Sequence, residues 1–93
     1  MELTNKRIIY LVKNEDSNLK LDGEVSIRED GTITYFSGSF YTLESAYTGS
    51  FNYAEDDSGL INKSVNSVPK EDEDKSMSLL DKTIDEIKIQ IKE

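Results

Sequence analysis

The fold is decided by residues 36–53, which read FSGSFYTLESAYTGSFNY. This stretch contains the same phrase twice, at 36–40 and at 47–51: an aromatic residue, a hydroxyl residue, glycine, serine and phenylalanine. If Thr42 faces Tyr47, a four-residue loop at 43–46 connects the two strands. A loop of this length is a common connection between antiparallel strands. We therefore expect a β-hairpin centred on this loop.

In the expected register, each glycine of the repeat has an aromatic ring across the ladder. An aromatic side chain in this position covers the bare backbone of the glycine. A shift of one residue would turn the aromatic side chains of one strand to the other face. The expected pairs are Phe36 with Tyr53, Gly38 with Phe51, and Phe40 with Gly49.

The preceding residues 19–28 alternate between apolar and polar side chains, which is typical of a strand with one buried face. Gly23 interrupts the alternation and indicates a bulge or a bend. The Asp-Gly dipeptide at 30–31 is a strong signal for a two-residue hairpin turn, so we expect Glu29 to face Thr32. The resulting pairs are Leu21 with Phe40 and Val25 with Phe36.

The two expected hairpins agree with each other, because both place Phe36 and Phe40 on the same face of a sheet. Agreement between independent local signals is evidence for a single structure.

Residues 6–13 supply a further strand. The continuous apolar run at 8–12 predicts burial on both faces and a central position in the sheet. We therefore expect a four-stranded antiparallel meander.

The second face of this sheet is partly apolar, which is unusual for a face that meets only water. We expect either the C-terminal helix or a binding partner to cover it. Its apolar side chains are Ile9, Leu11, Ile33, Tyr35 and Tyr41.

Residues 55–75 are rich in charge, with seven acidic residues and three lysines. Such a composition indicates a mobile linker. Residues 60–68 inside it are ambiguous and fit either a short fifth strand or a helical turn. Pro69 then ends any regular element.

The C-terminal residues 76–92 predict an α-helix, because apolar side chains recur at spacings of three and four. Ser78 and Asp81 resemble a capping box at its start. The segment 87–92 alternates strictly and is β-branched, so a strand remains the alternative there. The apolar stripe consists of Met77, Leu80, Ile84, Ile87 and Ile91.

The predicted fold is α+β: four, or with the ambiguous segment five, antiparallel strands followed by one C-terminal α-helix. A chain of 93 residues has the size of a single domain. Within 1–93 we expect a sheet at 5–54, an acidic linker at 55–75 and a helix at 76–92. The helix stripe fits packing on the chain's own sheet, and a homodimer through the same stripe is the alternative.

The chain carries 19 acidic and 11 basic residues, a formal net charge of -8. This charge repels nucleic acids and anionic membranes and attracts basic proteins. No apolar run is long enough to span a bilayer. Residues 1–4 do not open a signal peptide, so we expect a cytoplasmic protein, in the host cytoplasm if a phage encodes it.

Catalytic residue types are scarce. The sequence contains no histidine and no cysteine, so the commonest metal ligand and the usual general base are absent. No glycine-rich phosphate-binding loop is present, and no segment matches the spacing of a calcium loop. We expect a protein that is not an enzyme and that holds no metal and no cofactor.

These features predict a small acidic binding protein that inhibits a basic, nucleic-acid-handling protein. A phage inhibitor of a host nuclease or of a CRISPR effector, or another nucleic-acid mimic, has this profile. The alternatives are an immunity protein or antitoxin that neutralises a cognate toxin, and a homo-oligomeric assembly module. The candidate partner-binding residues are Asp22, Glu24, Tyr41, Glu44, Glu55, Asp56 and Asp57.

Overall fold

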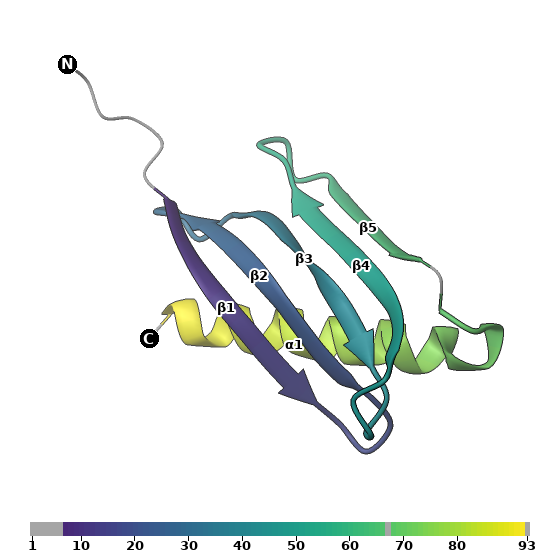
Figure 1. The fold of residues 1–93 in the computed structure, drawn as a ribbon. Helices are drawn as coiled ribbons and strands as arrows, with labels where there is room; N and C mark the ends of the chain where they lie inside the picture. Colours follow the sequence, from purple (N-terminus) through teal and green to yellow (C-terminus); the bar gives the residue numbers. More distant parts are fainter. Residues whose placement is uncertain (1–6, 67, 93) are drawn as a thin grey trace.

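The computed structural model describes residues 7–66 and 68–92. The strands form one antiparallel sheet in the order β1-β2-β3-β4-β5, and a helix follows it (Figure 1). The predicted α+β fold is confirmed, with the meander in its five-stranded form. The elements are β1 (Arg7–Glu15), β2 (Lys20–Arg28), β3 (Ile33–Tyr41), β4 (Tyr47–Glu55), β5 (Ile61–Asn66), the 3-10 helix η1 (Lys70–Asp72) and α1 (Glu73–Lys92).

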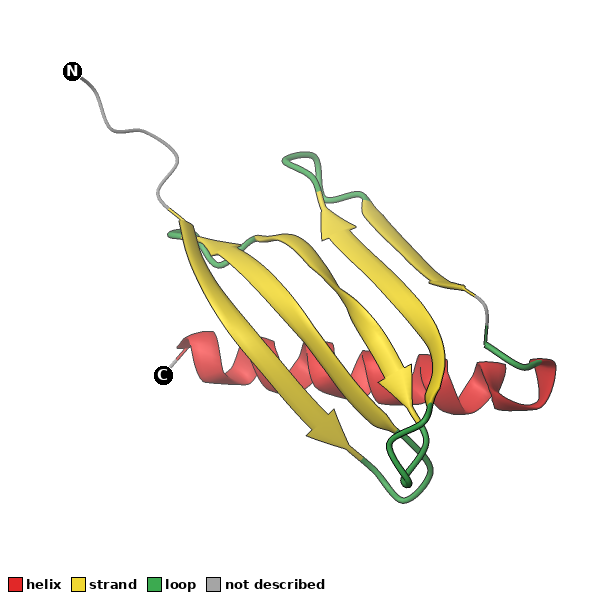
Figure 2. Ribbon diagram, viewed as in Figure 1, coloured by secondary structure: helices red, strands yellow, loops and turns green. Residues whose placement is uncertain are grey.

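The molecule has two layers, because α1 runs diagonally across one face of the sheet (Figure 2). The apolar stripe of α1 packs on the side chains that β2, β3 and β4 direct to the same side. The expectation that the stripe packs on the chain's own sheet is confirmed for Met77, Leu80, Ile84 and Ile87, whereas Ile91 is exposed and Leu79, which was not assigned to the stripe, is buried. The core consists of Leu19, Leu21, Val25, Ile27, Ile33, Phe36, Phe40, Phe51, Tyr53, Leu79, Leu80 and Ile84.

The expected pairing is confirmed through the middle of both hairpins. The pairs are Leu21 with Phe40, Val25 with Phe36, Phe36 with Tyr53, Gly38 with Phe51, and Phe40 with Gly49.

The turn between β2 and β3 differs from the expectation. The register shifts between Ser26 and Ile27, so Thr34 is an extra residue in β3. Its hydroxyl donates a hydrogen bond to the carbonyl of Ser26 at 3.1 Å. The expected pairing of Glu29 with Thr32 is therefore wrong.

This bulge also changes the face on which Ile33 lies. An extra residue in a strand reverses the alternation beyond it. Ile33 was expected on the second face, but it lies in the core with 0% of its surface exposed. It pairs with Ile27, which is also buried.

A second bulge lies beside the loop between β3 and β4. The register shifts between Phe40 and Tyr41, so Tyr41 pairs with Tyr47. The loop is closed by the backbone N–H of Thr42, which donates to the carbonyl of Ala46 at 2.8 Å. The expected pairing of Thr42 with Tyr47 is wrong by one residue.

The position of β1 is the largest correction. The apolar run at 8–12 predicted a central strand buried on both faces, but β1 lies at the edge and pairs only with β2. Its residues Arg7–Leu11 are all exposed. Asn14 attaches the other end of β1 to α1, since its side-chain amide donates to Thr83 at 2.9 Å and to Glu86 at 3.0 Å.

The segment 55–75, expected as a mobile linker, contains ordered elements. β5 occupies 61–66, which settles the ambiguity at 60–68 in favour of a strand, and the sheet therefore extends beyond residue 54. Pro69 precedes η1, where its fixed backbone angle suits the start of a helix.

The helix α1 begins at Glu73, three residues earlier than expected. Acidic residues in a first helical turn interact favourably with the helix dipole. The capping box expected at Ser78 is wrong, because this residue lies inside the helix. Residues 87–92 are helical because Ile87 packs against the core while Ile89 lies exposed.

The glycines of β2 and β3 make room for one aromatic ring. Gly23, Gly38 and Phe51 lie in one row across three strands. The ring of Phe51 reaches across to Gly23, where a Cβ would lie 3.0 Å from the ring tip. At Gly49, expected to be covered by Phe40, a Cβ would instead meet Val68 and the carbonyl of Asn66.

We predict that Gly38→Val destabilises the fold by about 1–3 kcal/mol, as overpacking does. A Cβ at Gly38 would contact the backbone of Asp22 and lie 2.5 Å from the Cα of Gly23, so the two strands would have to separate. Urea unfolding monitored by circular dichroism measures the change. Gly59→Asn is the control, because a Cβ there meets nothing within 4 Å and asparagine is one of the side chains that best tolerate the positive φ of this residue. An unchanged midpoint for Gly38→Val contradicts the packing described above.

Candidate protein-binding surface

The candidate partner-binding residues lie in three separate places. Asp22, Glu24 and Tyr41 belong to the sheet face opposite α1, which we call the open face. Glu44 lies in the loop between β3 and β4. Glu55 is the last residue of β4, and Asp56 and Asp57 follow it at the other end of the sheet. A strand of nine residues spans roughly 27 Å, so these places do not form one patch.

From β2 to β5 the open face is polar and rich in serine and asparagine, and Ile9 and Leu11 of β1 add an apolar margin to it. Its acidic side chains include Glu15, Asp22 and Glu24, and Lys13 and Lys20 lie among them. The uncharged polar residues on this face include Tyr35, Ser37, Ser39, Tyr41, Ser50, Asn52, Asn62, Ser64 and Asn66.

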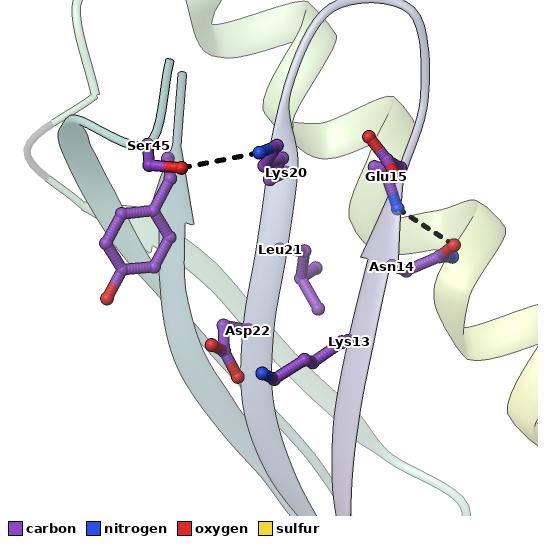
Figure 3. A pocket seen from close by; sticks show the side chains of 8 residues that line it. Lys13, Asn14, Glu15, Lys20, Leu21, Asp22 and Ser45 are labelled. Carbon is purple, nitrogen blue, oxygen red and sulfur yellow. Dashed lines mark hydrogen bonds between the residues drawn. The ribbon is translucent and has the colours of Figure 1, made fainter. Parts of the chain in front are cut away.

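A shallow depression of about 520 Å³ lies at the edge of this face, beside the β1–β2 turn (Figure 3). The side chain of Lys13 points toward that of Asp22, and the ammonium of Lys20 donates to the hydroxyl of Ser45 at 3.3 Å. Tyr41 also lines the depression. Because lysines and carboxylates alternate here, this site has no strong preference for a cation or an anion.

Glu24 is partly engaged within the chain. It accepts a hydrogen bond from the hydroxyl of Tyr35 at 2.8 Å. This bond, together with desolvation and the nearby negative charge of Glu24, raises the pKa of Tyr35. Tyr35 therefore stays protonated and continues to donate to Glu24 under ordinary conditions.

Glu55 has a structural role that its sequence position does not indicate. Only 13% of its side chain is exposed. Its carboxylate accepts from the backbone N–H of Ile33 at 2.9 Å, from the hydroxyl of Tyr53 at 2.6 Å, and from Lys88 at 2.7 Å. It therefore joins β3, β4 and α1, and little of it remains for a partner.

The environment of Glu55 shifts two pKa values. Burial disfavours the charged carboxylate, but the hydrogen bonds from Lys88, Tyr53 and Ile33 outweigh it, so the pKa of Glu55 is lowered. Burial, and then the bond to Glu55, raises the pKa of Tyr53. Both shifts favour a charged Glu55 beside a neutral Tyr53.

The neighbouring acids also hold the chain in place. Asp56 accepts from the hydroxyl of Ser58 at 2.7 Å and from the backbone N–H of Leu60 at 2.9 Å, and these bonds help to lower its pKa. Asp57 pairs with Arg28 at 2.5 Å. The turn after β4 is thus tied to the end of β2, although Asp57 itself remains exposed.

The most acidic described surface is the outer side of α1, which the sequence analysis did not single out. Residues 70–86 hold seven acidic residues and three lysines, so they contribute -4 of the net charge of -8. Asp74, Asp81 and Asp85 are exposed and lie at spacings of seven and four residues, on one side of the helix. This periodicity was readable from the sequence, but the division into a linker and a later helix separated its members.

Several contacts fix this acidic helix on the sheet. Lys63 of β5 pairs with Asp81 at 2.6 Å, and Lys88 pairs with Glu55. Leu79, Leu80 and Ile84 are buried below. The carboxylates of the outer side therefore project from a rigid support.

An apolar groove of about 590 Å³ lies between β1 and the C-terminal half of α1. Ile8, Tyr10, Ile87 and Ile91 are among its lining residues.

Within residues 7–66 and 68–92, no cluster of three acidic side chains is suited to a metal ion. In the same ranges, no helix combines the length and apolar character needed to cross a membrane.

No protein-family model, curated protein or solved structure matches this chain. Its function has to be inferred from its own surfaces.

We predict that Glu55→Gln lowers the free energy of unfolding by about 1.5–3 kcal/mol near pH 7, the range for hydrogen bonds to a charged group. The folded-state pKa of Glu55 lies below the unfolded value of 4.5. Its stabilisation is therefore complete above that pH and is lost as the pH falls through the folded-state pKa. Urea unfolding of both proteins at about pH 7 and about pH 3 measures the difference, which should shrink at the lower pH.

The control for this experiment is Glu44→Gln, which removes a carboxylate from an exposed loop position. It should leave the unfolding midpoint unchanged at both pH values. A difference between Glu55→Gln and the wild-type protein that is the same at both pH values would contradict the role assigned to the charge.

Proposed function

We propose that this chain is a small, acidic, non-enzymatic binding protein that inhibits a basic, nucleic-acid-handling partner. The observation that carries the proposal is the exposed acidic side of α1, where half of the net charge of the chain is concentrated within 70–86. A surface of this sign attracts a cationic groove and speeds the encounter with it.

The rigidity of the helix supports the proposal. Asp74, Asp81 and Asp85 rise along the helix by about 10 Å and then about 6 Å, at 1.5 Å per residue. Because α1 is packed on the sheet, these carboxylates keep their spacing before they bind. Asp81, which pairs with Lys63, still has 52% of its side chain exposed. A preorganised surface loses less conformational entropy on binding than a flexible acidic tail does.

The binding mode that follows is competition. A groove that holds the phosphates of a nucleic acid is lined by lysine and arginine side chains. A row of fixed carboxylates offers these side chains charge-assisted hydrogen bonds in place of the phosphates. Nucleic acid and this chain would then exclude each other from the same groove.

We predict that affinity capture from the native cell with the tagged protein retains a basic nucleic-acid-handling protein at about 0.05 M salt and releases it at about 0.5 M, where charges are strongly screened. The captured protein should lose its bound nucleic acid when this chain is added. Capture that is indifferent to salt, or no capture of a basic protein, contradicts the proposal. A captured toxin would assign the chain as an immunity protein instead.

Charge reversal on α1 tests which surface is used. Asp74→Lys combined with Asp85→Lys should weaken capture by roughly tenfold or more. The matched control is Glu29→Lys combined with Glu44→Lys, which makes the same change in net charge away from α1. Circular dichroism shows whether both variants fold. Equal losses for both variants would show that only the total charge matters.

A further inference from the structure

The outer edge of β1 is the most apolar exposed surface of the described chain. Leu11 is 83% exposed, Ile9 56%, Tyr10 50% and Ile8 49%. Unpaired, long and apolar edge strands invite pairing with another strand, and proteins normally guard them with charge, proline or short length. Residues 8–11 contain none of these devices.

The opposite edge of the sheet is guarded. β5 has six residues against nine in β1, and Lys63 lies in its centre. Lys63 is also held by Asp81 of α1. The difference between the two edges indicates that β1 is kept free for a contact.

The backbone of β1 shows which residues are available to such a contact. The N–H of Asp16 donates to the carbonyl of Leu19 at 3.0 Å, which makes this a hydrogen-bonded pair in the register of β1 and β2. Hydrogen-bonded and non-hydrogen-bonded pairs alternate along an antiparallel ladder. The backbone groups of Arg7, Ile9 and Leu11 therefore point away from β2, toward the free edge.

The exposure pattern selects the N-terminal half of β1. All five residues of 7–11 are exposed, whereas Val12 and Asn14 are half-buried on the helix side. The apolar groove beside Ile8 and Tyr10 opens along the same half. Figure 1 shows the C-terminal end of α1 on this side of the sheet.

We propose that a second copy of this chain occupies the edge, with the two β1 strands antiparallel about a two-fold axis at Ile9. Closed two-fold pairing satisfies both β1 edges at once and leaves only the guarded β5 edges at the two ends of the joined sheet. Three hydrogen-bonded pairs then form, which amounts to about six backbone hydrogen bonds. This inference does not depend on the proposed function. The facing pairs are Ile9 with Ile9, Arg7 with Leu11, and Ile8 with Tyr10 of the second copy.

The side chains of this pairing are complementary in shape and charge. Ile8 and Tyr10 of both copies close the two grooves against each other. Arg7 of one copy lies opposite Leu11 of the other copy, and that Leu11 pairs with Glu24 of its own chain. The three residues therefore lie in one row across three strands. Two strand spacings, about 10 Å, separate Arg7 from Glu24. The two long side chains can span this distance, and symmetry provides the contact twice.

Sedimentation analysis tests the dimer. Two chains of 10.6 kDa give a dimer of about 21 kDa. Ile9→Lys places two like charges together at the axis and should raise the dimer Kd on the order of 100-fold or more. Leu60→Lys is the control, since Leu60 is 70% exposed but lies away from β1 and should leave the dimer intact. A monomeric wild-type protein, or a dimer unaffected by Ile9→Lys, overturns the proposal.

Charge exchange tests the register. Arg7→Glu alone should weaken the dimer roughly tenfold, because it faces Glu24 of the second copy. Adding Glu24→Lys should restore it, whereas adding Glu15→Lys should not. If Glu15→Lys restored the dimer and Glu24→Lys did not, the two strands would pair in another register, and the two-fold axis would not lie at Ile9.

A cysteine variant gives a test that does not need a destabilising change. The chain has no cysteine, so Ile9→Cys introduces the only thiol. Residues in a hydrogen-bonded pair have Cα atoms about 5.5 Å apart, which permits a disulfide. Ile9→Cys should form a covalent dimer under mild oxidation much faster than Leu60→Cys. Equal rates for the two variants overturn the proposal.

Discussion

A single helix has to cover a five-stranded sheet, and it is too narrow to do so. The 20 residues of α1, about 30 Å long, cross the whole width of the sheet, but the helix with its side chains is only about 10–12 Å across, whereas strands of nine residues are about 27 Å long. The helix therefore buries the side chains of β2, β3 and β4, where Phe36, Phe40 and Phe51 are almost fully covered. The N-terminal half of β1 lies outside this cover. The exposure of Ile8 and Tyr10 on the helix side follows from this limit, whereas Ile9 and Leu11 lie with Glu24 on the open face, which no described element covers.

The centre of the sheet was predictable because its evidence is local. The alternation at 19–28 and the repeated phrase at 36–53 each specify which side chains share a face, and both lead to the same pairs. The two bulges were not predictable in this way. A bulge such as that at Thr34 changes the turn by one residue without altering the central pairs, so the hydrophobic pattern does not reveal it. The one sign of this bulge in the sequence is Ile33. Without an extra residue in the strand, this apolar side chain would lie on the open face instead of in the core.

The position of β1 could not be read from its composition. A run of apolar residues indicates burial only if neighbours exist on both sides, and the number of neighbours is set by the whole chain. The candidate binding residues show a similar limit. The total charge was available from the sequence, but Glu55 became a buried acceptor for three donors because β3 and α1 meet at its position. The acidic side of α1 was overlooked because its first turn was assigned to a linker.

The two proposed surfaces make different use of electrostatics. Two copies that each carry a net charge of -8 repel each other, and salt screens this repulsion. The contact at β1 rests mainly on backbone hydrogen bonds and apolar side chains, and the two symmetric pairs of Arg7 with Glu24 add a smaller contribution. Salt therefore favours the dimer, whereas it weakens the attraction between α1 and a basic partner. A two-fold axis perpendicular to the sheet keeps both α1 helices on the same side, so a dimer would present two acidic helices to one partner surface. The dimer would therefore raise the density of negative charge that faces the partner. Its own stability depends on the apolar contact at β1, so the two surfaces use different residues and can operate together.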